Sequence, residues 1–181
     1  MNIVQKRLRR LSRLTKALLA AGLLLIIYGY LCRSLRLYFF WESRAIGWDF
    51  FCMGIIMLLT DLIRVKSVLQ KHTLPEKIGI GIISFILLAQ AIFLVLLPFT
   101  DAYITARDYL PESPELCEEV GDISSFSLMP AGGIQQTADS SGQYGNAAIS
   151  LIVKGEKKFA DITIFVAKYP DSTAWKVEGI D

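Results

Sequence analysis

The sequence predicts an α+β protein in which three transmembrane helices are followed by a small outer domain, made of a helix and an antiparallel meander. Hydrophobic residues make up 53% of its 181 residues and the mean hydropathy is +0.44, more than a soluble domain of this length usually carries. The charged residues are also distributed unequally between the two parts of the chain. Residues 1–100 hold 13 Lys or Arg against four acids (+9), while residues 101–181 hold six against 13 (−7). We therefore expect a membrane anchor over 1–100 and a soluble domain over 101–181.

Three apolar segments predict the membrane helices, at about 17–32, 45–63 and 78–100. The third is the clearest, because the 23 residues between Lys77 and Asp101 carry no charge. As a helix they would rise about 34 Å, enough to cross a bilayer. The first segment is short for a full span. The second carries an aspartate near each end, which leaves open whether it fully spans.

The distribution of Lys and Arg predicts the orientation, since cytoplasmic loops carry the excess of these residues. Six lie in residues 1–16 and four between Arg64 and Lys77, against three in the intervening loop. This places the N-terminus in the cytoplasm and the C-terminal domain in the periplasm, with the protein in a bacterial inner (plasma) membrane. If the second helix did not span, the domain would be cytoplasmic. An acid-free, Arg-rich start also resembles a mitochondrial presequence, so the mitochondrial inner membrane is an alternative.

The C-terminal domain opens with two predicted helices. The first, over 101–110, is expected to continue the third membrane helix outward until Pro111, which lacks an amide proton and restricts the residue before it. The second covers 114–120. Ser113 is its expected N-cap, and Gly121 its C-terminal stop.

Hydrophobic alternation then predicts strands, because residues of one kind recur at every second position. The expected strands are 124–129, 146–154, 159–168 and 173–180. In the third of them, Ile162 and Ile164 lie on one face and Phe165 on the other. The segment from Pro130 to Gly145 is rich in Gly, Ser and Gln, and is either a long mobile loop or an extra hairpin around 134–137.

Several short motifs follow one another along this domain: Ser113-Pro114-Glu115-Leu116, then Gly121, a strand ending in Val153-Lys154-Gly155, and a closing Trp175-Lys176-Val177. Over residues 102–181 this order resembles the cytochrome c oxidase assembly factor 1 family, whose domain is similar to that of a small subunit of the mitochondrial presequence translocase. The resemblance implies a role in assembling a respiratory oxidase. It makes Gly121, Gly155 and Trp175 candidate interaction residues. The three predicted spans, in place of one, depart from that family.

No catalytic group of residues is recognisable. The single histidine, His72, lies between the second and third predicted helices, and no P-loop, dinucleotide fingerprint or zinc-spaced Cys/His set occurs. We therefore expect a protein that is not an enzyme, with no catalytic residue, metal site, cofactor or identified small-molecule substrate. Cys32, Cys52 and Cys117 are compatible with metal or redox work, with a Cys32–Cys52 disulfide, or with ordinary packing.

Three polar or aromatic side chains are further interaction candidates. Asp61 lies near the end of the second predicted span, where it forms either an interfacial ion pair with Arg64 or part of an ion or proton pathway. Gln90, near the middle of the third span, is suited to hydrogen bonding between helices. Trp175 either fills the domain core or serves as a binding-site aromatic.

Two function classes follow from these features. The first is a non-enzymatic assembly or scaffold factor, whose helices dock beside a membrane protein complex while the acidic domain contacts a partner subunit. The second is an envelope sensor, ligand-binding or protective (immunity-type) membrane protein that uses the Pro130–Gly145 segment. The basic N-terminus adjoins an apolar span, so its expected partner is membrane lipid and not nucleic acid.

Overall fold

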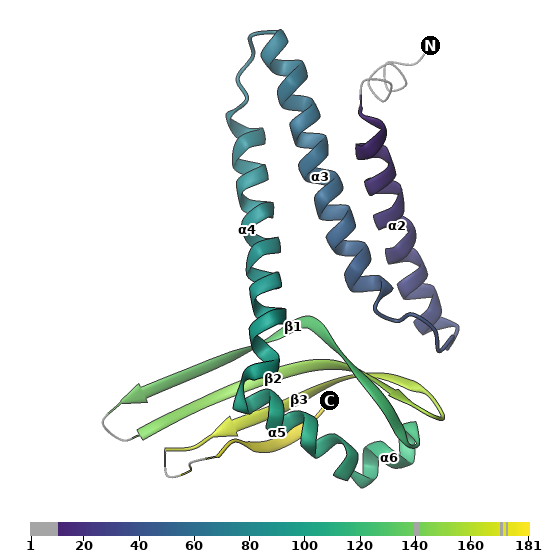
Figure 1. Cartoon of the computed structure of the whole chain (residues 1–181), viewed down its shortest axis with the longest axis vertical. Helices are drawn as coiled ribbons and strands as arrows, with labels where there is room; N and C mark the ends of the chain where they lie inside the picture. Colours follow the sequence, from purple (N-terminus) through teal and green to yellow (C-terminus); the bar gives the residue numbers. More distant parts are fainter. Residues whose placement is uncertain (1–10, 140–141, 171, 173) are drawn as a thin grey trace. The chain divides into compact units, whose positions relative to one another are not determined.

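The fold is that of a computed structural model, which describes residues 11–139, 142–170, 172 and 174–181 (Figure 1). The chain divides into two compact units, Met1–Ala91 (the helical unit) and Ile92–Asp181 (the sheet unit). The mixed α+β class is as predicted, with three long apolar helices followed by a four-stranded antiparallel sheet. The N-terminal cations at positions 6, 7, 9 and 10 lie outside the described residues.

Three helices are long and apolar enough to cross a membrane: α2 (Arg13–Ser34), α3 (Ser43–Val68), and α4 (Leu74–Leu96), which a 3₁₀ turn at Leu97–Phe99 extends. Each covers a predicted span, and the protein is a membrane protein by this criterion. α2 begins earlier than expected because Ser12 is its N-cap, with the Ser12 Oγ accepting a hydrogen bond from the Thr15 amide at 3.0 Å. α3 runs on past Arg64, so the cations there are helical and the connecting loop is short.

Four glycines allow α2 and α3 to pack backbone against backbone. Gly22 and Gly29 in α2, like Gly47 and Gly54 in α3, are seven residues apart and so share one face of their helix. A Cβ atom built on Gly22 would lie 2.6 Å from the Phe51 amide nitrogen. Close approach through small residues is how helices pair in lipid, where burial of apolar surface does not drive them together.

The third membrane helix does not continue into the next one, which corrects the prediction for 101–110. Pro98 lies in the 3₁₀ turn that ends α4, and Thr100 then starts the separate helix α5 (Asp101–Tyr109). The Thr100 Oγ1 accepts a hydrogen bond from the Tyr103 amide at 3.3 Å. The break follows from the missing amide proton of proline, which removes one bond of the helical ladder.

The short second helix agrees with the sequence. A 3₁₀ turn containing Pro111 ends α5, and α6 spans Pro114–Val120 after Ser113. Gly121 follows α6 at φ +79°, a backbone conformation that a residue with a Cβ rarely adopts. The predicted C-terminal stop at Gly121 is therefore confirmed.

The sheet is a meander in the order β1-β2-β3-β4, antiparallel throughout: β1 (Ile123–Asp139), β2 (Gly142–Gly155), β3 (Phe159–Lys168) and β4 (Lys176–Ile180). β1 and β2 both run through the Pro130–Gly145 segment, so the mobile-loop alternative is wrong for its described residues and the hairpin is longer than 134–137. β4 begins at Lys176, while Thr173, the expected start, lies outside the described residues.

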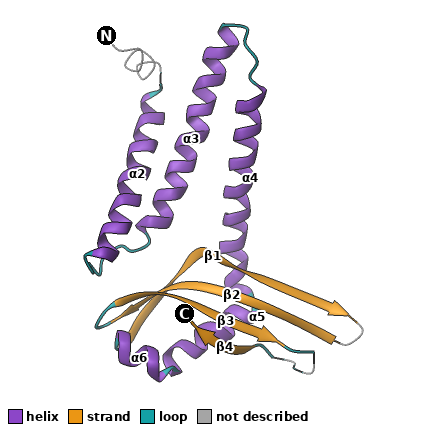
Figure 2. Ribbon diagram, turned by 180° about the vertical axis from the view of Figure 1, so that it is seen from behind, coloured by secondary structure: helices purple, strands orange, loops and turns teal. Residues whose placement is uncertain are grey.

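Both short helices contribute to a core on one face of the sheet (Figure 2). Buried residues of α5, of α6 and of the 3₁₀ turn between them meet alternate residues of β2 and β3: Ala102, Ala106, Leu110, Leu116, Val120, Ala147, Ile149, Leu151, Val153, Ile162, Ile164 and Val166. Leu97, 2% exposed, and the half-buried Phe93 also join this core. The compact unit therefore begins at Ile92 and not at Asp101, because the end of α4 supplies part of its core.

Candidate functional site

The second face of the sheet carries the candidate site. Because side chains alternate along a strand, the residues between the core positions point away from α5 and α6. The register places Gln135 opposite Asn146 and Ala148 opposite Phe165 on this second face. Gln135, Asn146 and Phe165 are exposed, Phe165 by 42%. Phe165 is thus a large apolar side chain that stays exposed beside two amides at this end of the sheet.

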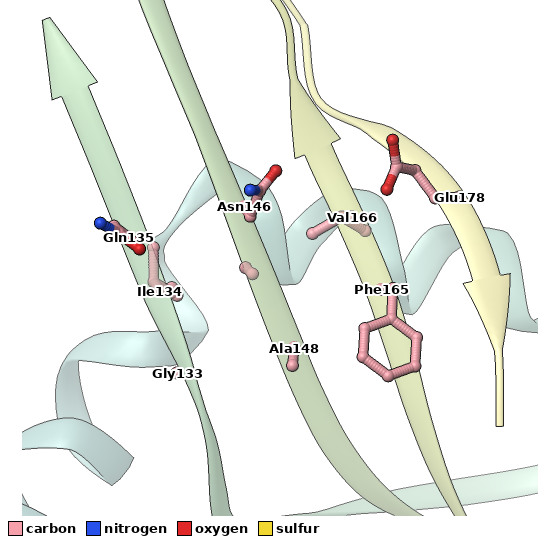
Figure 3. A pocket seen from close by; sticks show the side chains of 9 residues that line it. Gly133, Ile134, Gln135, Asn146, Ala148, Phe165, Val166 and Glu178 are labelled. Carbon is pink, nitrogen blue, oxygen red and sulfur yellow. The ribbon is translucent and has the colours of Figure 1, made fainter.

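These residues form an open groove of about 520 Å³ (Figure 3). Each strand contributes one prominent side chain: Gln135 from β1, Asn146 from β2, Phe165 from β3 and Glu178 from β4. The other lining residues are Gly133, Ile134, Ala147, Ala148 and Val166. Among the described lining residues, Glu178 carries the only charge.

Two glycines leave free space above this face of the sheet, and one of them, Gly133, lines the groove. A Cβ atom built on Gly133 would meet no atom within 4 Å, and the same holds for Gly179, which lies opposite Phe165. Space above both glycines is therefore free for a larger group, which separates them from the glycines that are needed for close packing.

The groove carboxylate is held in place by a neighbouring tyrosine. The Tyr169 hydroxyl donates a hydrogen bond to the Glu178 Oε1. That bond, together with the negative charge of Glu178, raises the pKa of Tyr169 above its usual value, since both favour the protonated phenol. Tyr169 thus remains a neutral donor that orients Glu178.

In the helical unit, Asp61 is buried, at 7% exposed, and connects two helices. Its Oδ2 accepts hydrogen bonds from the Ser12 amide at 2.9 Å and from the Thr15 hydroxyl at 2.7 Å. Arg64 lies at 4.0 Å from Oδ1 and is mostly exposed. The expected interfacial ion pair is therefore the weaker contact, and the main role of Asp61 is to cap the start of α2 from α3.

Two further polar contacts join α3 to α4. The Gln90 Nε2 donates a hydrogen bond to the Asp49 Oδ1 at 2.8 Å, and Lys66 forms an ion pair with Glu76. The Gln90 bond is of the interhelical kind expected from its position in the span. Asp49, which the sequence placed only near a helix end, is its acceptor.

The candidates that came from the family resemblance lie inside the sheet unit. Trp175 is 7% exposed and belongs to the core, at 3.0 Å from the Cβ position of Gly145. Gly155 ends β2 and faces the Val120 carbonyl, and Gly121 ends α6. None of the three lines the groove, so their role is to pack the domain that carries it.

The cysteines are free thiols, and Cys32 is fully buried, with its Sγ donating to the Gly29 carbonyl at 3.3 Å. Over the described part of the chain, no three His, Cys, Asp or Glu side chains gather closely enough to hold a metal ion.

The groove residues were not singled out from the sequence, although one signal was present. Phe165 falls on the face of its strand that also carries Asp161 and Thr163, so the alternation of β3 already placed an aromatic ring on the face opposite the core. The other three residues come from three other strands, so only the register could bring them together.

Comparisons with known proteins add no relative: no family model, no curated protein and no solved structure matches this chain.

Proposed function

We propose that this protein is a non-enzymatic, membrane-anchored assembly or scaffold factor for a respiratory oxidase complex. The helices hold it beside the complex, and the sheet unit contacts a partner subunit. The observation that carries the proposal is the groove, in which one side chain from each of four strands is presented on the face opposite the helices. Its lining of two amides, one aromatic ring and one carboxylate suits recognition of another polypeptide.

The absence of a nucleophile paired with a base among the described groove residues supports a binding role over catalysis. The choice of a respiratory oxidase depends on the resemblance over residues 102–181. That resemblance also favours an inner-membrane location.

The first test concerns topology. With the N-terminus cytoplasmic and three spans, a periplasm-dependent reporter fused after Asp181 should be active and a cytoplasm-dependent one silent. The reason is the excess of cations at the N-terminus and from Arg64 to Lys77, which covers the end of α3, the short loop and the start of α4. Removing the charge of Lys71 and Lys77 alone should leave this orientation unchanged, because the N-terminal cations remain. The reverse reporter pattern would place the sheet unit in the cytoplasm and end this proposal.

The second test is recovery of the partner. A tagged full-length chain, solubilised in mild detergent, should co-purify subunits of a respiratory oxidase, while the same tag on an unrelated three-span protein should not. Deletion of the gene should lower the level of assembled oxidase, measured by its haem spectrum in isolated membranes. An unchanged oxidase level together with no recovered subunit would contradict the assembly role.

A second candidate function is an envelope sensor, ligand-binding or protective protein. The groove volume favours it, because about 520 Å³ is within the range of small-molecule sites. The Pro130–Gly145 segment would act through Gln135, as part of a strand and not as a loop. This candidate predicts no stable recovery of oxidase subunits.

A further inference from the structure

We infer that the groove binds an extended, basic segment of the partner protein, with a Lys or Arg side chain placed between Phe165 and Glu178. The inference rests on the proposed scaffold function and specifies the chemistry of its partner. Gln135 and Asn146 would hydrogen-bond to the backbone of the segment, since an amide side chain offers both a donor and an acceptor.

Charge complementarity identifies the occupant as basic. Within the described groove lining the single charge is the carboxylate of Glu178. A cation seated there is balanced, whereas an anionic segment would be repelled.

The exposed ring of Phe165 also favours a basic segment as the occupant. A cation over the face of an aromatic ring is attracted to it, and Arg and Lys are the side chains that use this contact. The sheet already has one such pair, because the Lys154 Nζ lies 5.9 Å from the Phe159 ring centre. Phe165 lies on β3 with Phe159 and keeps 42% of its surface exposed.

The shape of the groove favours a polypeptide in extended form. Four strands about 4.8 Å apart give a width of about 14 Å, which about four extended residues would cover. Gly133 and Gly179 leave the space above the sheet open for such a segment. The basic N-terminus of this chain is excluded as the occupant, since the proposed topology puts it on the other side of the membrane.

The test uses the full-length protein in nanodiscs of neutral phosphatidylcholine, which a basic peptide does not bind by charge. The probe is a fluorescent nine-residue peptide, Gly-Ser-Arg-Ser-Arg-Ser-Arg-Ser-Gly, and its control has glutamine in place of arginine. Anisotropy should show binding of the arginine peptide and about tenfold weaker binding of the control.

Two single substitutions then locate the site. Phe165→Ala and Glu178→Gln should each weaken binding of the arginine peptide about fivefold or more. Glu118→Gln is the matched control, because it removes the same charge from α6, which packs on the opposite face. It should change the dissociation constant less than about twofold.

A third variant fills the groove without disturbing the fold. Gly133→Phe introduces a ring where a Cβ meets nothing within 4 Å, so the thermal unfolding midpoint should be kept while binding is lost. Equal weakening by Glu118→Gln and Glu178→Gln would show general charge attraction and overturn the inference. Unchanged binding in Phe165→Ala or Gly133→Phe would overturn it as well.

Failure of the two proposals can be told apart. If oxidase subunits co-purify with wild type and equally with Gly133→Phe, the scaffold function stands and the groove is not the contact surface. If the peptide binds in the groove but no oxidase subunit is recovered, the groove assignment stands and the oxidase role is wrong.

Discussion

Replacing Gly22 with valine is expected to separate the first two membrane helices and to destabilise the helical unit by about 3 kcal/mol. A Cβ atom at this position would lie 2.6 Å from the Phe51 amide nitrogen and 2.8 Å from its Cα. Both atoms belong to the backbone of α3, so no side-chain rotation can relieve the contact. The helices must move apart, and the contacts at Gly29, Gly47 and Gly54 weaken with them.

The reactivity of Cys32 is a suitable measurement. Cys32 is fully buried in α2, and with Cys52 and Cys117 replaced by serine it is the single thiol of the chain. In detergent-solubilised Gly22→Val, a maleimide reagent should label Cys32 at a lower temperature than in the parent, because the helices separate earlier.

Gly81→Val is the matched control. Gly81 is also within a membrane helix, but a Cβ atom built there meets nothing within 4 Å. Its labelling curve should coincide with that of the parent. If Gly22→Val behaved like Gly81→Val, the close packing of α2 on α3 would be wrong.

The membrane helices were found from the sequence because charge and apolarity act over whole segments, whereas their ends depend on single side chains. α2 starts at Arg13 because Ser12 caps its first turn. α3 continues past Arg64 to Val68, although the cations that follow Arg64 in the sequence had predicted a loop there. The contacts between α2 and α3 were harder to predict from the sequence. The equal spacing of Gly22–Gly29 and Gly47–Gly54 could have indicated the packed faces, but which helices meet depends on the tertiary structure.

In the sheet unit the alternation of β3 was sufficient to predict both of its faces. The Pro130–Gly145 segment was ambiguous, because Gly, Ser and Gln have little strand preference of their own; its described residues are held by the pairing of β1 with β2. The groove could not be predicted as a site for the same reason: Gln135 and Glu178 become neighbours of Phe165 only through the pairing of four strands. Local patterns therefore fix the elements, and the register determines the site.

The start of the sheet unit shows how two predicted segments can share one core. Leu97 lies in the apolar run that predicted the third span, yet it belongs to the same core cluster of the sheet unit as Ala106 and Ile164. At the end of a membrane span, the sequence alone does not distinguish an apolar residue that faces lipid from one that packs against protein. The sequence boundary at residue 101 therefore marks the first charge, whereas the compact sheet unit begins at Ile92, just before the first core residue, Phe93.

Gly155→Ala is expected to destabilise the sheet unit by about 3 kcal/mol, through a steric conflict at the end of α6. A Cβ atom at Gly155 would lie 2.1 Å from the Val120 carbonyl oxygen and 2.7 Å from its carbon. That oxygen also accepts a hydrogen bond from the Lys157 amide at 2.9 Å, which joins α6 to the turn between β2 and β3. The methyl group would displace the carbonyl and break this bond, while Val120 is fully buried and cannot move freely.

In a background of Trp41→Phe and Trp48→Phe, the fluorescence of the core residue Trp175 reports unfolding of the sheet unit in the full-length protein. Gly179→Ala, whose new Cβ meets nothing within 4 Å, should unfold as the background does. Coinciding unfolding curves for Gly155→Ala and Gly179→Ala would mean that α6 does not pack on the β2–β3 turn. The face of the sheet that the helices cover would then be wrongly assigned, and the position of the groove with it.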